Sequence, residues 1–579
     1  MAGQSRKWMI LVATIWIQAF TGTNFDFSAY SSELKVVLGV SQVQLNNLAT
    51  ASDLGKALGW SSGLALMYMP LWVVMFIAAF MGLVGYGLQY LVILNLISLP
   101  YYAVFLLCLL AGSSICWFNT VCFVLCIKNF PSNRPLALAL TVSFNGVSAA
   151  LYNLAANALN PSSTSFYLLL NAFIPLFVSF MALIPILRQP DLEPLPSDVT
   201  KRDQFSFLVL NFLAVITGLY LLLLQSSDLF TAQVLFLGAI ILLVIPFGIP
   251  GIIYARELFK HNVYSSIRFE DSSTSFLLVD HDDLELHKEK MSRENSLISE
   301  GSMIGGRGEI VTLSSYYGLF PGKSAEGGGN DQKWSSCEGI MGTDKLTTLG
   351  EEHKAGVLVH RLDFWLYYVA YFCGGTIGLV YSNNLGQIAQ SLGQTSMTST
   401  LITLYSSFSF FGRLCSAVPD YIRTKLYFAR TGWLAIALLP TPIAFFLLAA
   451  ASDSNMALQA GTSLIGLSSG FIFSAAVSIT SELFGPNSVG VNHNILITNI
   501  PIGSLVYGFL AAIVYDANSG SSSSGLDNIV CIGKHCYFLT FFTWGCISIV
   551  GLLSSLVLFL RTRPVYERFE KTRISPILN

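Results

Sequence analysis

The sequence predicts an all-α protein that crosses a membrane many times, in two groups of six helices with two extra helices between them. Apolar residues make up 53% of the 579 residues and charged residues only 11%, whereas a soluble protein carries about 25% charged residues. The apolar residues also gather in runs of about 20, the length that crosses roughly 30 Å of hydrocarbon as a helix. We count about fourteen such runs, at 8–29, 47–69, 71–92, 100–126, 136–158, 165–187, 205–225, 231–254, 361–382, 398–418, 428–450, 457–479, 493–514 and 537–560.

The runs divide the chain into regions of different character. Two blocks of six runs are separated by a pair of runs and then by a long stretch rich in Ser, Gly and charge. Such a stretch cannot bury enough apolar surface to fold alone, so we expect a largely disordered loop there. The predicted regions are a six-helix bundle at 1–190, two linker helices at 191–254, the loop at 255–360, a second six-helix bundle at 361–560 and a tail at 561–579.

The distribution of Lys and Arg predicts the orientation in the membrane. With the N-terminus in the cytoplasm, only Lys35 and Lys534 fall on the opposite side. By the positive-inside rule, both termini and the 255–360 loop are therefore cytoplasmic. Cys531 and Cys536 then lie on the other side, where an oxidising compartment would allow a disulfide between them. The plasma membrane and the vacuolar membrane both satisfy these observations.

One serine of the predicted loop has the setting of a phosphorylation site. Arg293 stands three residues before Ser296, which suits a kinase that recognises a basic residue at that spacing. A solvated serine in a linker is the plainer alternative.

Charged residues inside the first two runs are candidates for function, because charge is costly within a membrane. Asp53 and Lys56 are three residues apart and so are neighbours on a helix surface. They form either a pair that responds to a solute or a proton, or an ion pair that neutralises itself and fixes packing. Asp26 shares a helix face with Gln18 and Gly22 and lies near the outer end of the first run.

Amide side chains form stripes along other runs. Asn145 and Asn153 are eight residues apart on one face, and Asn383 and Gln387 are four apart, with Asn384 beside them. Unsatisfied polar groups are too costly to face lipid, so these stripes face other helices or a water-filled path. Both alternatives stay open. The uncharged amides suggest that a transported solute is small and polar or singly charged.

A short polar turn joins the runs at 398–418 and 428–450. It carries Arg413, Asp420 and Arg423, and an Asp at such a turn can accept from a helix N-terminus and pair with arginines. We expect these residues, with Glu482, to form a cytoplasmic gate that locks the two bundles together. Basic residues placed only by membrane orientation are the alternative.

Several other classes of protein have no support in the sequence. There is no GxxxxGK[ST] phosphate loop, no HExxH and no histidine spacing typical of a metal site, so we expect neither an ATP-driven pump nor a metal, a cofactor or an enzyme active site. The net charge of −2 and the lack of a basic stripe argue against a nucleic-acid partner.

The chain resembles the plant nodulin-like branch of the major facilitator superfamily over nearly all of both halves. The second half is also similar to monocarboxylate and oxalate carriers. The resemblance is carried by Arg6-Lys7-Trp8, Tyr30-Ser31-Ser32, Asp53-Leu54-Gly55-Lys56, Asn384-Leu385-Gly386-Gln387-Ile388, Ser481-Glu482-Leu483-Phe484-Gly485, Pro501-Ile502-Gly503-Ser504 and Cys531-Ile532-Gly533-Lys534-His535-Cys536-Tyr537.

The resemblance implies the major facilitator fold and transport by alternating access. Arg413, Asp420 and Arg423 match the gate motif of that superfamily in outline, although Ser416 stands where glycine is usual. The equivalent turn of the first half, at 68–70, has neither Asp nor Arg.

These observations predict a secondary transporter of a small polar solute, an organic anion or related metabolite, with proton coupling as one option. The predicted partners are the lipid bilayer, the solute and the kinase. The alternative is a solute sensor or membrane scaffold that signals through the 255–360 loop without net transport.

Overall fold

The structure is a computed structural model in which residues 3–66, 68–130, 133–160, 163–188, 197–224, 229–270, 346, 348–423, 427–485, 488–519 and 531–574 are described. Every element in these ranges is helical. Ser296 and most of the 255–360 loop lie outside the described residues, and so do the predictions made for them. Residues 252–331 form a separate unit, of which the described part is the continuation of one linker helix.

The first bundle holds six helical segments, three of them interrupted. Its elements are α1 (Gly3–Thr21), η1 (Thr23–Asp26), α2 (Phe27–Leu38), α3 (Gln42–Ala57), α4 (Trp60–Ala65), α5 (Leu71–Ile93), α6 (Tyr101–Asn129), α7 (Arg134–Gly146), α8 (Ser148–Leu159) and α9 (Phe166–Leu187). The linker helices are α10 (Ser197–Leu223) and α11 (Leu229–Val244), which continues through η2 (Ile245–Phe247) into α12 (Gly248–Glu270).

The second bundle follows the same plan. Its elements are α14 (Ala355–Leu358), α15 (Leu362–Tyr371), the π-helical turn η4 (Phe372–Thr376), α16 (Ile377–Asn383), α17 (Leu385–Ser391), η5 (Thr395–Met397), α18 (Thr398–Cys415), α19 (Val418–Ile422), α20 (Arg430–Leu438), α21 (Pro440–Ala451), α22 (Asn455–Phe484), α23 (Val489–Ile497), α24 (Asn499–Ser519) and α25 (His535–Ile574). Helix α12 runs beyond the predicted start of the loop, and α14 forms before its predicted end.

Within the described residues, twelve helices are long and apolar enough to cross a membrane. They correspond to the third to fourteenth predicted runs. The first run is divided among α1, η1 and α2, and the second between α3 and α4. Both of these interruptions lie beside a charged residue, Asp26 and Lys56. The all-α polytopic fold class is confirmed.

The two bundles repeat one packing device. In the first bundle, a methyl group on Gly55 of α3 or on Gly112 of α6 would lie 2.0 or 1.8 Å from a backbone carbonyl oxygen of the other helix. In the second, a methyl group on Gly412 of α18 or on Gly470 of α22 would lie 2.0 Å from such an oxygen. These are the second and fourth helices of each bundle, and small residues let helix backbones approach closely in a membrane. The second and fourth helices of the two bundles therefore pack in the same way.

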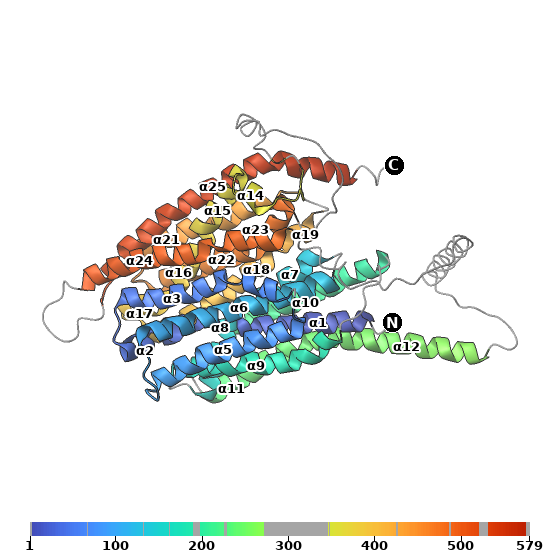
Figure 1. The fold of residues 1–579 in the computed structure, drawn as a ribbon, viewed down its shortest axis with the longest axis horizontal. Coiled ribbons are helices and arrows are strands. Elements are labelled where there is room, and N and C mark those ends of the chain that lie inside the picture. The colour runs from blue at the N-terminus through green and yellow to red at the C-terminus, as the bar shows by residue number, and fades with distance from the viewer. Residues whose placement is uncertain are drawn as a thin grey trace, which may run out of the picture. The chain divides into compact units, whose positions relative to one another are not determined.

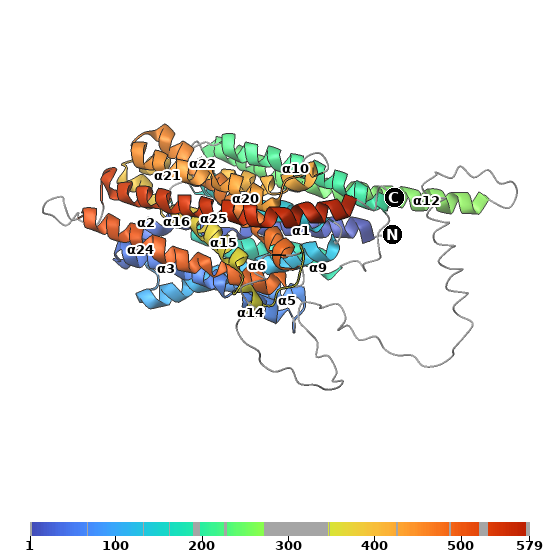
Figure 2. The ribbon, with the colours of Figure 1, turned by 90° about the horizontal axis from the view of Figure 1, so that it is seen from above.

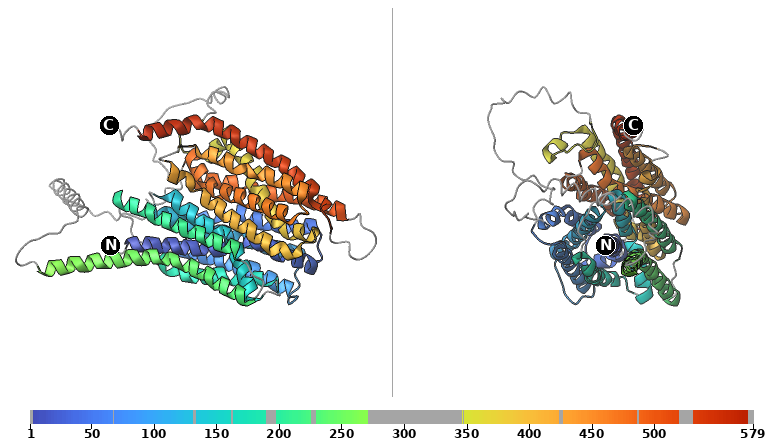
Figure 3. Two further views of the ribbon diagram at one scale, coloured as in Figure 1. Left: turned by 180° about the vertical axis from the view of Figure 1, so that it is seen from behind. Right: turned by 90° about the vertical axis from the view of Figure 1, so that its right-hand side faces the viewer.

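The bundles lie side by side, the first in blue to green and the second in yellow to red (Figure 1), and Figure 3 shows the same two groups from behind and end-on. They meet where α2 packs on α17, α3 on α24, and α7 and α8 on α18. Helix α1 begins and α25 ends on the same side of the bundles. We call this the terminal side, and the side of α2 and α17 the far side.

Helix α10 packs against both bundles and runs along their flank (Figure 2). The Lys7 ammonium of α1 lies 2.6 Å from a carboxylate oxygen of Asp203 on α10. The Asn211 amide of α10 donates to the Tyr421 hydroxyl of α19 at 2.8 Å. The linker is therefore bonded to each half of the protein on the terminal side.

Burial explains why the amide stripe of the fifth segment does not face lipid. In the span that contains α7 and α8, 89% of the apolar window is buried, against 22% in the span of α11 and α12. The fifth segment lies between its own bundle, α10 and α18, so its polar side chains reach other helices.

Candidate functional site

Asp53 and Lys56 form an ion pair that also joins the bundles. The Lys56 ammonium lies 2.5 Å from Asp53 Oδ1, and the two side chains are 10% and 1% exposed. The second carboxylate oxygen accepts a hydrogen bond from the hydroxyl of Ser504 on α24. The pair is thus neutralised internally and bridges α3 to the second bundle at the same time.

The substitution Asp53→Asn is expected to lower the free energy of unfolding by about 3–5 kcal/mol, because it leaves the Lys56 ammonium buried without its partner. The double variant Asp53→Asn/Lys56→Met removes that charge and should recover most of the loss. Thermal unfolding of the purified variants in one detergent measures both. A double variant no more stable than the single one would contradict a self-neutralising pair.

Arg413 is the buried cation on the other side of the interface. Its side chain is 5% exposed and donates from Nη1 to the Val142 carbonyl oxygen at 3.2 Å and to Asn145 Oδ1 at 3.1 Å. The guanidinium carbon lies 5.7 Å from the centre of the Phe473 ring. These contacts place Arg413 and Asn145 together between α18 and α7, whereas the sequence predicted Arg413 beside Asp420.

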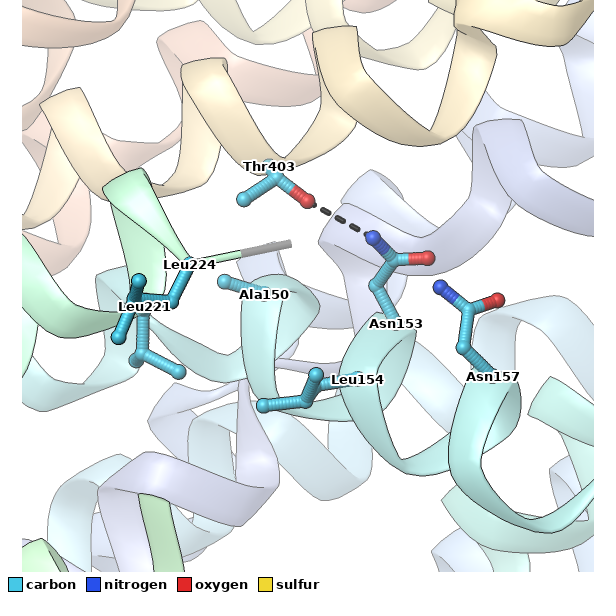
Figure 4. Close-up of a pocket in the computed structure, with 7 residues that line it drawn as sticks. All are labelled: Ala150, Asn153, Leu154, Asn157, Leu221, Leu224 and Thr403. Carbon is cyan, nitrogen blue, oxygen red and sulfur yellow. Dashed lines mark hydrogen bonds between the residues drawn. The ribbon is translucent and has the colours of Figure 1, made fainter. Parts of the chain in front are cut away.

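Asn153 is a hydrogen-bonding centre between the bundles. It donates from Nδ2 to Thr403 Oγ1 at 2.8 Å and accepts at Oδ1 from the Ser399 hydroxyl at 2.8 Å and the Tyr167 hydroxyl at 2.7 Å. Figure 4 shows the bond from Asn153 to Thr403, with Asn157 beside it. The Asn153 amide thus makes three hydrogen bonds to hydroxyl groups of the protein.

A small cavity adjoins Asn153, at the point where the first bundle, α10 and α18 meet. Its volume is about 10 Å³, which is the size of one water molecule. A metabolite does not fit there in this conformation. The cavity is lined by Ala150, Asn153, Leu154, Asn157, Leu221, Leu224 and Thr403.

The amides of the second bundle lie on the far side. Gln387 of α17 donates to the Ser31 hydroxyl of α2 at 3.0 Å. Asn384 donates to the Val380 carbonyl oxygen of its own helix at 2.9 Å, and Asn383 is 8% exposed. Of the three predicted residues, Gln387 is the one with a hydrogen bond to the first bundle in the described structure.

A second far-side contact involves a residue that sequence reasoning missed. The Asn46 amide of α3 donates to the Gly508 carbonyl oxygen of α24 at 2.9 Å. Asn46 lies at the edge of the second apolar run, two turns before Asp53, and this helical spacing is the signal that could have found it. Together with Gln387, it closes the bundles against each other on the far side.

On the terminal side, the charged residues predicted as a gate cluster around another missed residue, Arg430. Its guanidinium lies 2.8 Å from Asp420 Oδ1 and 2.9 Å from Glu482 Oε1. The Tyr566 hydroxyl donates to the other oxygen of Glu482 at 2.8 Å. We call Asp420, Arg430, Glu482 and Tyr566 the terminal-side cluster.

The terminal-side cluster contains two of the four residues predicted as a gate, Asp420 and Glu482. Its members come from α19, α20, α22 and α25, and Arg423 pairs at 2.7 Å with Glu570 of α25. All these bonds lie within the second bundle. The fourth residue predicted for the gate, Arg413, instead bonds to Val142 and Asn145 of the first bundle.

A cavity of about 270 Å³ adjoins the terminal-side cluster. Tyr427 lines it and donates to the Tyr566 carbonyl oxygen at 2.7 Å. Burial raises the pKa of Tyr427 to about 12, so its hydroxyl stays protonated at neutral pH and remains a donor. The other lining residues include Leu349 and Gly350, which come from the end of the predicted loop.

Cys531 and Cys536 are bonded to each other in the structure. The peptide nitrogen of Gly533, within their loop, donates to the Ser391 carbonyl oxygen of α17 at 2.6 Å. With His535, the two sulfurs form the one group in the described residues whose atoms are close enough to hold a metal. Because both sulfurs are in the disulfide, they are not thiolate ligands there.

Asp26 lies inside the first bundle, fully buried in η1. The side chains that interact with it come from α2, α5, α8 and α9. Asp26 therefore lies among helices of the first bundle.

Comparison with known proteins gives the family. Residues 7–251 match the model of the family described as nodulin-like, and residues 348–568 match that of the NFD4 C-terminal domain. The chain is 58% identical to the protein NUCLEAR FUSION DEFECTIVE 4 of Arabidopsis thaliana, over 99% of this chain and 92% of that protein. It is 28% identical to the probable transporter MCH1 of Yarrowia lipolytica, over 31% of this chain and 38% of that one.

Among solved structures, the xylose transporter XylE of E. coli, in a partially occluded inward-open conformation, superposes with a TM-score of 0.49 at 11% identity, over 95% of this chain and 97% of that one. The sequence relationship is much stronger, since it extends over both halves of a plant protein at high identity. The chain is an integral, multi-pass membrane protein and belongs to the plant nodulin-like family.

Proposed function

We propose that the protein is a secondary transporter that moves a small organic anion between two bundles by alternating access. The observation that carries the proposal is the chemistry of the interface. Asp53 bonds to Ser504, Asn153 to Thr403 and Gln387 to Ser31, each across the two bundles. Such hydrogen bonds can be exchanged for bonds to water or solute at little net cost. An interface that opens and closes needs this property.

The cations at the interface support an anionic solute. Arg413 is buried against Asn145, and Lys56 lies at the opposite contact between the bundles. A guanidinium matches a carboxylate in two parallel hydrogen bonds, and such charge-assisted bonds are stronger than neutral ones. In this proposal Arg413 binds the carboxylate, and the Asp53–Lys56 pair responds as the bundles separate. The similarity of part of the chain to a protein named as a probable transporter agrees with it.

The test is uptake of labelled organic acids, amino acids and sugars by proteoliposomes that contain the purified protein. Wild type should take up at least one organic acid saturably. Arg413→Gln should raise its KM about ten- to a hundredfold, the effect of losing a charge-assisted hydrogen bond. The matched control is Arg563→Gln, because Arg563 is 59% exposed and pairs with Glu567 one turn away. Equal KM values for the two variants would exclude Arg413 as the binding cation.

A sensor or scaffold is the second candidate, and one contact favours it. At the end of the central segment, the Gly350 nitrogen donates to the Glu482 carbonyl oxygen at 2.7 Å, and Glu352 accepts from the nitrogen and hydroxyl of Ser488. The segment is therefore bonded to the terminal-side cluster and to the start of α23. Deleting residues 271–340 separates the candidates, because a transporter keeps its uptake while a sensor loses its output.

A further inference from the structure

Asp26 differs from the other buried acids of the protein. The carboxyl groups of Asp26, Asp53, Asp203 and Asp363 are the four that are buried in the described residues. Three of them face a base: Asp53 lies 2.5 Å from Lys56, Asp203 lies 2.6 Å from Lys7, and Asp363 lies 2.6 Å from Arg561. Neither oxygen of Asp26 accepts a hydrogen bond from any described residue.

A buried amide that likewise lacks a hydrogen-bond partner lies beside Asp26. Asn171 of α9 is fully buried, and neither its nitrogen nor its oxygen has a hydrogen-bond partner among the described residues. The two side chains face each other without reaching the distance and angle of a hydrogen bond. Two unsatisfied polar groups at one buried point are costly unless something joins or neutralises them. Asn171 is the single amide of the sixth apolar run.

The other groups around Asp26 are neutral. Tyr30 of α2, Tyr86 of α5, Tyr152 of α8 and Tyr167 of α9 lie near enough to interact with it electrostatically. Three of their hydroxyls are bonded elsewhere, namely Tyr86 to Thr23, Tyr152 to the Phe20 carbonyl oxygen and Tyr167 to Asn153. Cys108 of α6, which interacts with Tyr30 and Tyr86, is bonded to Gln89. Besides the Asn171 amide, none of these described neighbours is a cation or a hydrogen-bond donor to Asp26.

We propose that Asp26 is a proton-binding site, which holds a proton in this conformation and releases it when movement of the bundles admits water to η1. An ionised carboxylate with no hydrogen bond and no cation is strongly disfavoured away from water, and such a group neutralises instead. The protonated carboxyl is the species that suits this site, and its O–H can be shared with the oxygen of Asn171. The site takes H⁺ alone, since it offers a metal ion one carboxyl and one amide.

Tyr167, which interacts electrostatically with Asp26, is connected by hydrogen bonds to the interface. Tyr167, one turn before Asn171 on α9, donates to Asn153 Oδ1 at 2.7 Å, and Asn153 bonds to Thr403 and Ser399 of α18. A change of charge at Asp26 therefore acts on the residue that holds the bundles together. This inference deepens the proposed function and rests on it, because it names the proton as the coupling ion.

The first test does not require a known solute. Infrared spectra of the full-length protein at neutral pH should show the carbonyl-stretching band of a protonated carboxyl, and Asp26→Asn should remove it. Glu33→Gln is the matched control, since Glu33 lies seven residues away in the same segment, is half-exposed and bonds to Thr164. The control should keep the band. A wild-type protein without the band, or a band that survives Asp26→Asn, would overturn the proposal.

The second test measures coupling in proteoliposomes. With Asp26→Asn, an inward proton gradient should no longer drive solute accumulation, while exchange of labelled for unlabelled solute at equal pH should persist, because exchange moves no net proton. Gradient-driven accumulation equal to wild type in this variant would reject the site. Should the wild type move no solute, the proposed function fails while the infrared result still decides whether Asp26 binds a proton.

Discussion

The substitution Gly55→Ala is expected to prevent α3 and α6 from packing and to leave little monodisperse protein. A methyl group on Gly55 would lie 2.0 Å from the Leu109 carbonyl oxygen and 2.8 Å from the Ser113 nitrogen. Both atoms belong to the backbone, which cannot move aside as a flexible side chain can. Overpacking a core costs about 1–3 kcal/mol when side chains give way, and we expect a cost above that range here. Size-exclusion chromatography and thermal unfolding in detergent measure it.

The control for this prediction is Gly63→Ala. Gly55, Gly59 and Gly63 form a GxxxGxxxG pattern, but a methyl group on Gly63 would meet nothing within 4 Å. The same substitution should therefore be tolerated there, and it exchanges glycine for a residue with better helix propensity. If both variants lose stability equally, the cause is the helix pattern in general and not the close contact with α6. Gly412→Ala in the second bundle should repeat the effect of Gly55→Ala, because it would approach the Leu467 carbonyl oxygen to 2.0 Å.

Replacing Arg430 with Met is expected to destabilise the second bundle by about 3–5 kcal/mol, the cost of removing one partner from a buried charge cluster. The Arg430 side chain is 7% exposed and contacts both Asp420 and Glu482, whose side chains are 19% and 29% exposed. Without the guanidinium, two carboxylates on neighbouring helices are left unpaired. Partial access of water to both carboxylates places the expected value near the lower end of the range. The midpoint of thermal unfolding measures the change.

Two comparisons isolate the charge of Arg430 as the cause. Arg423→Met breaks the single, partly exposed pair with Glu570, in which the side chains are 28% and 12% exposed, and should cost only about 1 kcal/mol. The triple variant Arg430→Met/Asp420→Asn/Glu482→Gln removes the charges together and should recover part of the stability. A triple variant weaker than Arg430→Met alone would show that packing of the arginine stem, and not its charge, stabilises these helices.

The order of residues along the chain decided most of the fold. Hydropathy over about 20 residues is a local property, so the runs that became α5, α6 and the later spans could be located before any contact was known. The adjacency of Asp53 and Lys56 follows from helical spacing in the same way, and the structure pairs them at 2.5 Å. The interruptions at η1 and after α3 were not located, because a break in a helix depends on what packs beside it.

The tertiary structure alone decided which charges meet. Arg430 reaches Glu482 across 52 residues, and Ser504 reaches Asp53 across 451; no helical period relates positions so far apart. Arg413 shares a sequence motif with Asp420, yet its position on the α7-facing side of α18 sends it to Asn145. Asp26 has a sequence setting like that of other membrane acids, and its lack of a base became apparent only from the neighbours that the fold places around it. The sequence determines which residues lie near one another on a helix. Helix packing decides which of those residues form an ion pair, a hydrogen bond or a proton-binding site.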